Sequence, residues 1–135
     1  MTAYWIVGAM FGGSDDCLSS FEERGYWYCW DNNIDIDESS FSWGNSVLAQ
    51  RERFKKIKLG DRIAVKKSLI GDGMIAVRAI GIVKDVDLSE WRVYVDWVLK
   101  EKDIGNRLVP ISGWTASIHG PYSAEDRYIK DIFIL

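Results

Sequence analysis

Three successive segments in the second half of the chain have the residue pattern of β-strands. Residues 61–68 alternate in side-chain character, with Ile63 and Val65 on one side of the expected strand. Residues 74–86 and 92–99 are rich in β-branched and aromatic residues. Alternation with a period of two is typical of a half-buried strand. The second half is therefore predicted to consist mainly of strands joined by short connections.

The first half mixes a strand, a helix and a long irregular segment. Residues 3–10 are aromatic and β-branched and predict a strand that ends at Gly12-Gly13. Residues 14–16 offer an N-cap, and the apolar spacing that follows predicts a helix ending at Gly25. Residues 31–46 show no period and are predicted to form a long loop, which in a compact domain is usually functional or disordered.

Three further segments complete the predicted architecture. Residues 47–57 predict a basic amphipathic helix, and residues 108–114 predict a short strand interrupted by Pro110 and Gly113. Residues 123–126 are expected to cap a last helical turn that leads to Ile129, Ile132 and Phe133. A succession of short strands with a few helices predicts an α+β fold, a small mixed β-barrel with flanking helices. At 135 residues, the chain is expected to be a single domain spanning residues 1–135.

The composition excludes several classes of protein. Apolar residues make up 47% and charged residues 27% of the chain, as in soluble globular proteins. Two cysteines do not make a disulfide framework, and a single histidine argues against a zinc site, so no metal or cofactor is expected. Residues 1–5 lack the basic region and cleavage site of a secretory signal. The expected compartment is the cytoplasm, and no membrane partner is expected.

Charge is distributed unevenly along the chain. Residues 14–40 hold eight acidic residues and one basic residue, whereas residues 51–67 hold eight basic and two acidic residues. The whole chain has a formal net charge of −3. A basic segment on an acidic protein can hold a phosphate backbone locally while the remaining surface repels it. A solvated surface without a partner is the alternative interpretation of residues 51–67.

Seven tryptophans are an unusually large number for a chain of this length. Trp27 and Trp30 lie in an aromatic run at residues 25–31, and Trp43 lies among serine, glycine and asparagine. Exposed aromatic rings of this kind stack well on nucleobases. The alternative for any one of them is a place in the core. Trp5, Trp91 and Trp97 lie in predicted strands and are expected to pack inside the barrel, and Trp114 fits either interpretation.

Catalysis is the alternative to binding, and the sequence offers few residues for it. Gly12-Gly13 lacks the spacing and the following Lys-Ser/Thr of a phosphate-binding loop. His119, in a predicted turn beside Gly120-Pro121, has the chemistry of a general base, and Cys29 that of a nucleophile. A lone histidine in a turn is more often structural, and no partner for Cys29 is visible. We therefore expect no enzyme activity in this chain, with a nucleic-acid hydrolase using His119 as an alternative.

A series of short motifs runs through almost the whole chain. The series comprises Trp5-Ile6-Val7-Gly8-Ala9, Gly12-Gly13, Gly25-Tyr26-Trp27, Gly60-Asp61-Arg62-Ile63-Ala64-Val65-Lys66, Gly81-Ile82-Val83, Val95-Asp96-Trp97 and Ile118-His119-Gly120-Pro121. In this order it resembles the PUA-like superfamily, which includes PUA, ASCH, EVE and YTH domains. It is most similar to EVE-like domains at the N-terminus of the AAA+ GTPase in methylation-dependent (McrBC-type) restriction systems. The chain departs from usual EVE domains at Gly8-Ala9-Met10, where they have Lys-Ser-Glu.

The resemblance implies a PUA-like, EVE/YTH-like domain that recognises a modified base in double-stranded DNA, flipped into an aromatic cage. The implied base-binding residues are Trp27 and Trp30 as walls, Trp43 as a lid, Gly12 and Gly13 as backbone beside the base, and Asp31 or Ser68 as hydrogen-bonding groups. The implied phosphate contacts are Lys55, Lys56, Lys66 and Lys67. The resemblance also implies a place in a restriction or defence system, with cleavage supplied by an AAA+ GTPase or nuclease partner.

Other binding functions fit the same residues. A reader of RNA or of a small nucleotide would use the same fold, and the ribose 2′-hydroxyl would distinguish them. A protein-interaction domain would dock a partner on the aromatic loop. Binding to a protein should survive high salt better than binding to phosphates, which weakens steeply with ionic strength.

Overall fold

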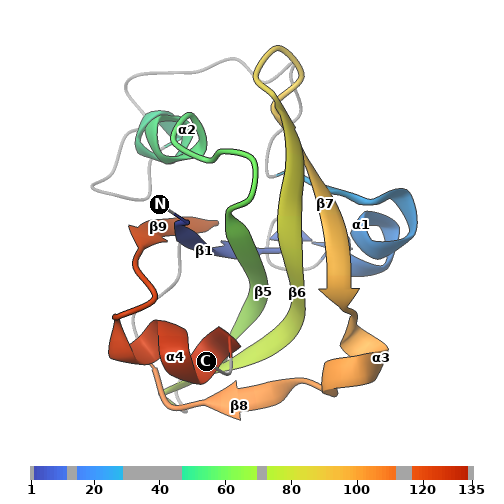
Figure 1. The fold of residues 1–135 in the computed structure, drawn as a ribbon. Helices are drawn as coiled ribbons and strands as arrows, with labels where there is room; N and C mark the ends of the chain where they lie inside the picture. The colour runs from blue at the N-terminus through green and yellow to red at the C-terminus, as the bar shows by residue number, and fades with distance from the viewer. Residues whose placement is uncertain (1, 12–14, 29–46, 70–72, 112–116, 134–135) are drawn as a thin grey trace.

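The computed structural model describes residues 2–11, 15–28, 47–69, 73–111 and 117–133. In this part of the chain, one curved sheet of seven strands is flanked by helices (Figure 1). A two-stranded pair is separate from this sheet. The predicted α+β class is confirmed at this level. The strands of the large sheet follow the order β4-β7-β6-β5-β1-β9, and β8 pairs with β6 off this path.

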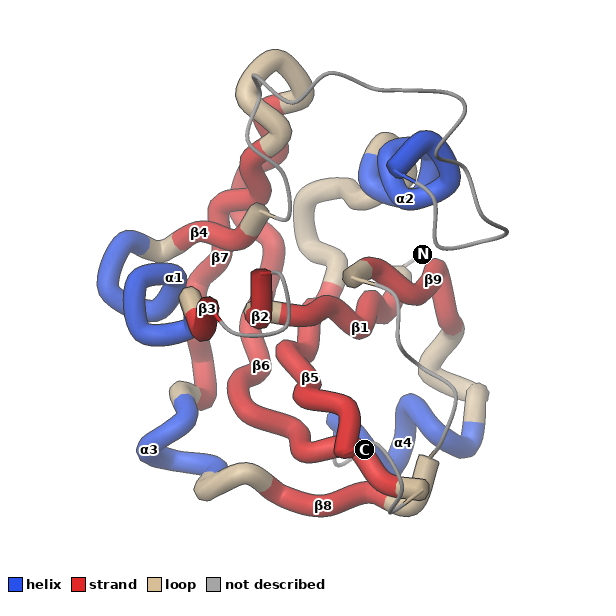
Figure 2. Tube along the Cα trace, turned by 180° about the vertical axis from the view of Figure 1, so that it is seen from behind, coloured by secondary structure: helices blue, strands red, loops and turns tan. Residues whose placement is uncertain are grey.

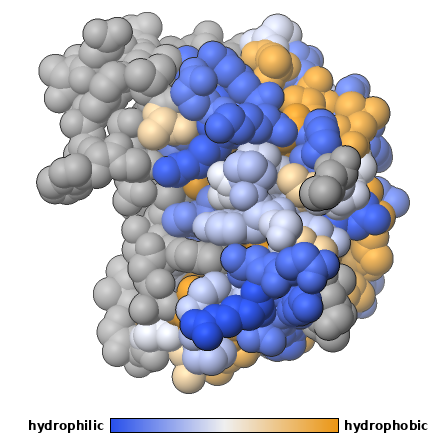
Figure 3. Space-filling model, turned by 60° about the vertical axis from the view of Figure 1, so that its left-hand side comes forward, coloured by the Kyte–Doolittle hydropathy of each residue, from blue (hydrophilic) through white to orange (hydrophobic). Residues whose placement is uncertain are grey.

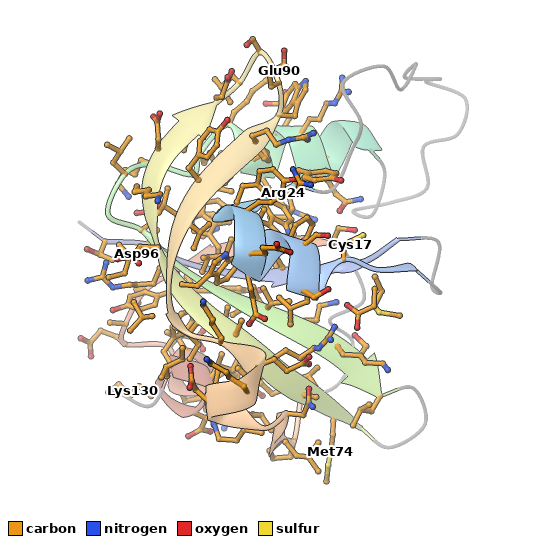
Figure 4. All side chains as sticks on the ribbon, turned by 90° about the vertical axis from the view of Figure 1, so that its right-hand side faces the viewer. Cys17, Arg24, Met74, Glu90, Asp96 and Lys130 are labelled. Carbon is orange, nitrogen blue, oxygen red and sulfur yellow. The ribbon has the colours of Figure 1, made fainter. Side chains whose placement is uncertain are left out.

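The central strands agree closely with the sequence pattern. They are β5 (Arg62–Leu69), β6 (Met74–Asp87) and β7 (Arg92–Leu99), paired antiparallel in succession. β6 spans the molecule, so that Met74 and Glu90, just beyond its other end, lie far apart in Figure 4. Gly81 lies at a register shift, and a Cβ there would be 2.9 Å from the Asp96 carbonyl oxygen. A side chain at this position would therefore collide with the neighbouring backbone, which explains the glycine in the middle of the strand.

The predicted strand at residues 3–10 is divided in two. β1 (Tyr4–Gly8) belongs to the large sheet, and β2 (Met10–Phe11) pairs with β3 (Asp15–Asp16). β1 runs parallel to β5, and its other edge pairs antiparallel with β9 (Ile118–Tyr122). β4 (Tyr26–Trp27) pairs with β7, and β8 (Arg107–Val109) pairs with the first half of β6.

The strand β9 corrects the prediction for His119. This residue is predicted to lie in a turn, but it lies inside β9 and pairs with Ile6 of β1. Its segment has the composition of a turn because Gly120 and Pro121 follow directly. Gly120 instead lies against the indole of Trp5, where a Cβ would come within 2.6 Å of the ring.

The helices lie around the periphery of the sheet (Figure 2). Their bounds are α1 (Leu18–Arg24), α2 (Val47–Phe54), α3 (Glu101–Ile104) and α4 (Arg127–Phe133). α1 ends at Gly25 in the left-handed conformation, as predicted. Its N-cap is Cys17 rather than a residue of 14–16, although the Asp16 carboxylate accepts a bond from the Leu18 amide at 3.2 Å. α3 is not predicted by the sequence pattern.

Hydrophobic clusters cover both faces of the sheet. Trp5, Val65 and other alternate residues pack with α1 and α2 on one face. Ile6 and Ala64 pack with α4 on the opposite face. The alternation in residues 61–68 predicts one buried and one polar side, but Ala64 and Lys66 on the second side are also buried. For Ala64, the reason is that α4 packs on that side.

Closure of the sheet into a barrel is not seen among the described strands. β4 and β9 stand at opposite ends of the strand order, although the Trp27 indole N–H of β4 donates to the Gly8 carbonyl of β1 at 2.8 Å. The predicted loop at 31–46 and most of the segment 108–114 beyond β8 lie outside the described residues. None of the described helices has the length and apolar character needed to cross a membrane.

Candidate ligand site at the ends of strands β1 and β5

The structure changes the role of Trp27, which is predicted from the sequence to be an exposed cage wall. Its side chain is fully buried, and its ring stacks on Phe54 at a centroid distance of 6.1 Å. Its position in β4 places Tyr26 and Tyr28 toward the other side, so the aromatic run alternates as a strand does. Trp27 is therefore a core residue and is not available to a ligand.

Most of the other predicted base-binding residues belong to parts of the chain that the structure does not describe. Trp30, Trp43, Gly12, Gly13 and Asp31 lie outside the described residues. Ser68 is described, and it is half-buried near the end of β5.

The predicted phosphate-binding lysines fall into two groups. Lys55, Lys56 and Lys67 are exposed, and Lys55 pairs with Glu52 at 3.1 Å on the surface of α2. Lys66 is only 6% exposed and so is not a surface contact for the phosphates of a duplex. Lys66 and Lys67 are adjacent, so they face opposite sides of the sheet. The sequence alone does not show which of the two is buried.

The parallel pairing of β1 and β5 positions Lys66. Gly8 is its register partner, and a Cβ on Gly8 would lie 4.0 Å from the Lys66 Nζ atom and 4.0 Å from the Ser117 Cα atom. The ammonium group therefore lies beside bare backbone where β1 ends. In the described part of the chain, it donates a hydrogen bond to the Ser68 hydroxyl, at a long distance of 3.4 Å. Burial lowers the pKa of Lys66 to about 8, because a charged amine loses hydration there.

Lys66 has no acidic partner in the described part of the chain, where the ion pairs involve other cations. An unpaired buried charge costs several kcal/mol unless it titrates or meets an anion or a strong acceptor. No pattern in the sequence indicates this state, because a single sequence does not show which lysine of a basic pair is turned inward.

Polar groups of β9 and α2 adjoin this position. The Ser117 carbonyl accepts a bond from the Gly8 amide at 3.0 Å, and the Ser117 amide donates to the buried Gln50 side chain at 3.0 Å. Arg53 of α2 donates to the Ile118 carbonyl at 3.1 Å. Gln50 and Arg53 are not singled out by the sequence pattern. Together they hold α2 against the strand that follows Ser117.

Arg78 is a second buried cation, and it is fully paired. It lies at the register shift where β6 has one residue more than β5. Its guanidinium binds both carboxylate oxygens of Asp16, at 3.0 and 2.6 Å, and Glu101 at 2.6 Å. These carboxylates raise the pKa of Arg78 against the opposing effect of burial. The hydrogen bonds from Arg78 also keep the pKa of Asp16 below its usual value.

Asp61, in the motif Gly60-Asp61-Arg62, has a structural role. Its carboxylate is fully buried and accepts bonds from the Lys58 ammonium, the Trp5 indole and the Ala3 amide. Burial acts to raise its pKa, but these bonds prevail and lower it. The motif therefore joins the start of β1 to the start of β5.

Arginine–aromatic stacks lie where α2 meets the turn between β6 and β7. The Arg51 guanidinium lies 4.6 Å above the ring of Trp91, and that of Arg92 lies 3.7 Å above the ring of Tyr28. Trp91 is predicted to lie in a strand, but it lies just before β7 with a positive φ of 53°. It is half-buried against Phe54, whereas Trp5 and Trp97 are core residues as predicted.

An open groove between α1 and β7 offers a different surface. Arg24 and Asp96, labelled in Figure 4, line it together with Glu22, Glu23, Lys84 and Lys100. The three acidic and three basic side chains leave it without a dominant sign, so it does not favour a charged ligand. In the described ranges, no group of three or more metal-ligating side chains is placed to hold a metal ion.

Comparison with known proteins does not assign this site. No known family has a sequence profile that matches the chain, and no curated protein matches it significantly.

Proposed function

We propose that this protein is a PUA-like, EVE/YTH-like module that recognises a modified base in double-stranded DNA and targets a restriction or defence system. The supporting observation is that cationic and aromatic side chains gather around α2 and the β6–β7 turn. Arg51 over Trp91 and Arg92 over Tyr28 are part of this group. The order of the sequence motifs supports the same proposal.

The surface of α2 is suited to a phosphate backbone. Lys55 and Lys56 are exposed at its end, and Lys67 is exposed on β5. Hydrophilic side chains gather in the upper part of the face shown in Figure 3, where α2 lies, and again in the lower part near α4. Because the whole chain is acidic, phosphates are attracted to this region and repelled from others.

The base would be held by aromatic rings other than Trp27. Flipping a base costs a few kcal/mol of stacking and pairing, which a stacked site must offset. Each aromatic stack contributes about 1–3 kcal/mol. We assign this role to Trp30 and Trp43, which the sequence places in the segment between β4 and α2. A single methyl group adds only about 0.8 kcal/mol on burial, so recognition of methylation requires a close-fitting site.

The test is a binding titration on three duplexes of one sequence: unmodified, carrying 5-methylcytosine, or carrying N6-methyladenine. The proposal predicts preferential binding to one modified duplex. Trp30→Ala and Trp43→Ala should each reduce that affinity by about 1–3 kcal/mol. Equal affinity for all three duplexes would contradict modified-base recognition. A matched RNA duplex in the same titration distinguishes the RNA-reading alternative.

The phosphate contacts are tested by the salt dependence of binding. The double variant Lys55→Gln/Lys56→Gln should reduce the slope of log K against log salt by about 0.9 for each lysine that binds a phosphate in the wild type. Lys102→Gln is the matched control, because Lys102 is an exposed lysine on α3, away from α2. An equal slope for both variants would show that Lys55 and Lys56 at the end of α2 do not contact the DNA.

A further inference from the structure

Lys66 is a buried amine that takes no part in the ion pairs of the fold. The residue is 6% exposed, and none of the ion pairs in the described segments includes it. Arg78, on the neighbouring strand, shows how a buried cation that serves the fold is paired, since two carboxylates lie 2.6 Å from its guanidinium. An amine that loses its hydration without such a partner shifts toward its neutral form.

The neutral amine has a property that the ammonium lacks. Its nitrogen carries a free lone pair and is therefore a nucleophile. Because burial lowers the pKa of Lys66 to about 8, roughly one tenth of it is free amine at pH 7, against roughly one part in 3,000 at the ordinary value of 10.5. Desolvated lysines of this kind attack carbonyl carbon atoms and form imines in enzymes.

The surroundings of the amine leave room for a small carbonyl compound. A carbon atom at the Cβ position of Gly8 would lie 4.0 Å from the Lys66 Nζ atom and 4.0 Å from the Ser117 Cα atom. Apart from Gly8 and its chain neighbours, no other atom of the described residues is closer to that position. Gly8, Ser68 and Ser117 are each half-buried, so this side of the amine borders solvent. A methyl-sized group therefore fits between the amine and the backbone of β1.

We propose that Lys66 is a carbonyl-reactive lysine, which condenses on its Gly8 side with an unhindered aldehyde, carried by a small molecule or by an abasic deoxyribose of DNA. The lone pair of Nζ forms a bond to the aldehyde carbon, and the carbonyl oxygen takes up one proton from the nitrogen. The resulting hydroxyl group leaves with the second proton as water, so that a C=N bond replaces the C=O bond. The Ser68 hydroxyl, 3.4 Å from Nζ, is placed to pass these protons from nitrogen to oxygen.

This inference goes beyond the proposed function, and only the abasic-DNA source depends on that function. The experiment first uses acetaldehyde at pH 7. Sodium borohydride then reduces the imine to a stable N-ethyl amine, which peptide mass spectrometry locates. Lys66 should be modified roughly tenfold or more faster than Lys84, because its free-amine fraction is roughly 300 times that of an ordinary lysine and outweighs its burial. Lys84 is the matched control, because it is an exposed lysine of the neighbouring strand β6. Equal or slower modification of Lys66 would overturn the inference.

Gly8→Ala tests the space beside the amine. The added methyl group meets the Lys66 Nζ atom and the Ser117 Cα atom at ordinary contact distances, so the fold should tolerate it. It occupies the room that acetaldehyde needs, so the rate at Lys66 should fall roughly tenfold, as expected when reacting atoms are displaced by about 1 Å. The rate at Lys84 should not change, and a denaturant melt confirms that the variant is folded. An unchanged rate at Lys66 in this variant would also overturn the inference.

A pH series on wild type supplies a readout that needs no variant. The rate at Lys66 should rise from pH 6 to 8 and level off above about pH 9, because the amine is then almost fully deprotonated. A rate that still rises in proportion to hydroxide between pH 9 and 10 would contradict the inference.

Few other groups near Lys66 in the described segments can account for such a profile. Its register partners, Gly8 on β1 and Val77 on β6, do not titrate. His119 of β9 lies on the other side of β1, where it pairs with Ile6, and His119→Gln is the control for its imidazole.

The remaining charged groups of the surrounding elements do not titrate at Lys66 in this range. Arg53 of α2 and Arg107 of β8 donate to carbonyl groups. Burial raises the pKa of Tyr122, at the end of β9, above its ordinary value of 10. The charged residues of α4 are exposed, and they are Arg127, Lys130 and Asp131.

A duplex with a single abasic site distinguishes the two sources of the aldehyde. A covalent protein–DNA product at Lys66 after borohydride treatment would assign the aldehyde to DNA. A duplex with a tetrahydrofuran residue, which lacks the aldehyde, should give no such product. A product with acetaldehyde alone would assign it to a small molecule. No product at Lys66 from either source would overturn this inference, whereas the titration on modified duplexes would still test the proposed function separately.

Discussion

Arg78 and Lys66 are buried to almost the same extent on neighbouring strands, with 5% and 6% of their surface exposed, but they are in opposite electrostatic states. Arg78 is bound by two carboxylates, which raise its pKa in spite of burial. Among the described residues, Lys66 has one long bond to a hydroxyl, and burial lowers its pKa to about 8. The sequence alone does not distinguish them, because both are basic residues within predicted strands.

The difference separates a structural charge from one available for binding. The Arg78 pairs connect β6 to the segment before α1 and to α3, so they hold elements together. Among the described residues, Lys66 joins no second element through an ion pair. Residues kept for function at a cost in stability are a recurrent feature of binding sites. The comparison therefore predicts opposite effects when each cation is replaced by methionine.

The largest expected effect is that of Arg78→Met. Removing the cation leaves Asp16 and Glu101 without their partner, which for buried pairs costs about 3–5 kcal/mol. Since both carboxylates are partly exposed, we expect a loss of about 3 kcal/mol in the free energy of unfolding, measured by urea denaturation. Arg78→Lys should recover only part of this loss, because lysine cannot bind both oxygens of one carboxylate in parallel. An Arg78→Met variant with an unchanged free energy of unfolding would contradict the comparison.

Lys66→Met should instead increase the free energy of unfolding. Methionine has a similar length and no charge, so its burial removes the cost of an unpaired ammonium. We expect the free energy of unfolding at pH 7 to rise by about 2 kcal/mol, in line with a pKa lowered from 10.5 to about 8. A loss of stability would mean that the Lys66 amine contributes to the fold, contrary to this account.

The pH dependence sharpens the same contrast. With a lowered pKa in the folded state, wild type binds fewer protons folded than unfolded between pH 8 and 10.5. Its free energy of unfolding should therefore increase across this window relative to that of Lys66→Met. The gap between the two proteins should be largest below pH 8 and should narrow as the pH rises. A constant gap across the window would contradict a lowered pKa.

The smallest effect concerns Asp16 in acid. Its pKa is lowered by the bonds from Arg78, so its contribution to stability is present above its unfolded pKa of 3.8 and is lost as pH falls through the lower folded value. Asp16→Asn should therefore reduce the acid sensitivity of the protein below about pH 4. The difference between the urea midpoints at pH 2.5 and pH 6 measures this acid sensitivity. If the difference is the same in Asp16→Asn as in wild type, Asp16 is excluded as a source of the acid sensitivity.

Alternating apolar and polar residues predict the fold well where the strands that pair follow one another in the sequence. The strands Met74–Asp87 and Arg92–Leu99 and the helix end at Gly25 follow from local pattern and turn chemistry. The parallel pairing of β1 with β5 could not be predicted in this way, because a long stretch of chain separates these strands. The location of His119 in β9 is missed because Gly120 and Pro121 give its segment the composition of a turn.

The candidate site is harder to predict than the fold. The aromatic run around Trp27 does not indicate which ring turns inward, since that depends on pairing with β7. Likewise, Lys66 and Lys67 are indistinguishable until the register with Gly8 is known. Ser68 is the predicted base-binding residue that lies in the described part and remains at the candidate site.

The most direct test of this account is the pKa of the Lys66 amine, measured by NMR on protein labelled at lysine, with Lys66→Met used to assign the signal. The account predicts a value near 8 in the free protein. It also predicts an increase when the preferred modified duplex binds, because an acceptor then stabilises the charged form. A value near the ordinary 10.5 in the free protein, unchanged by that duplex, would contradict it.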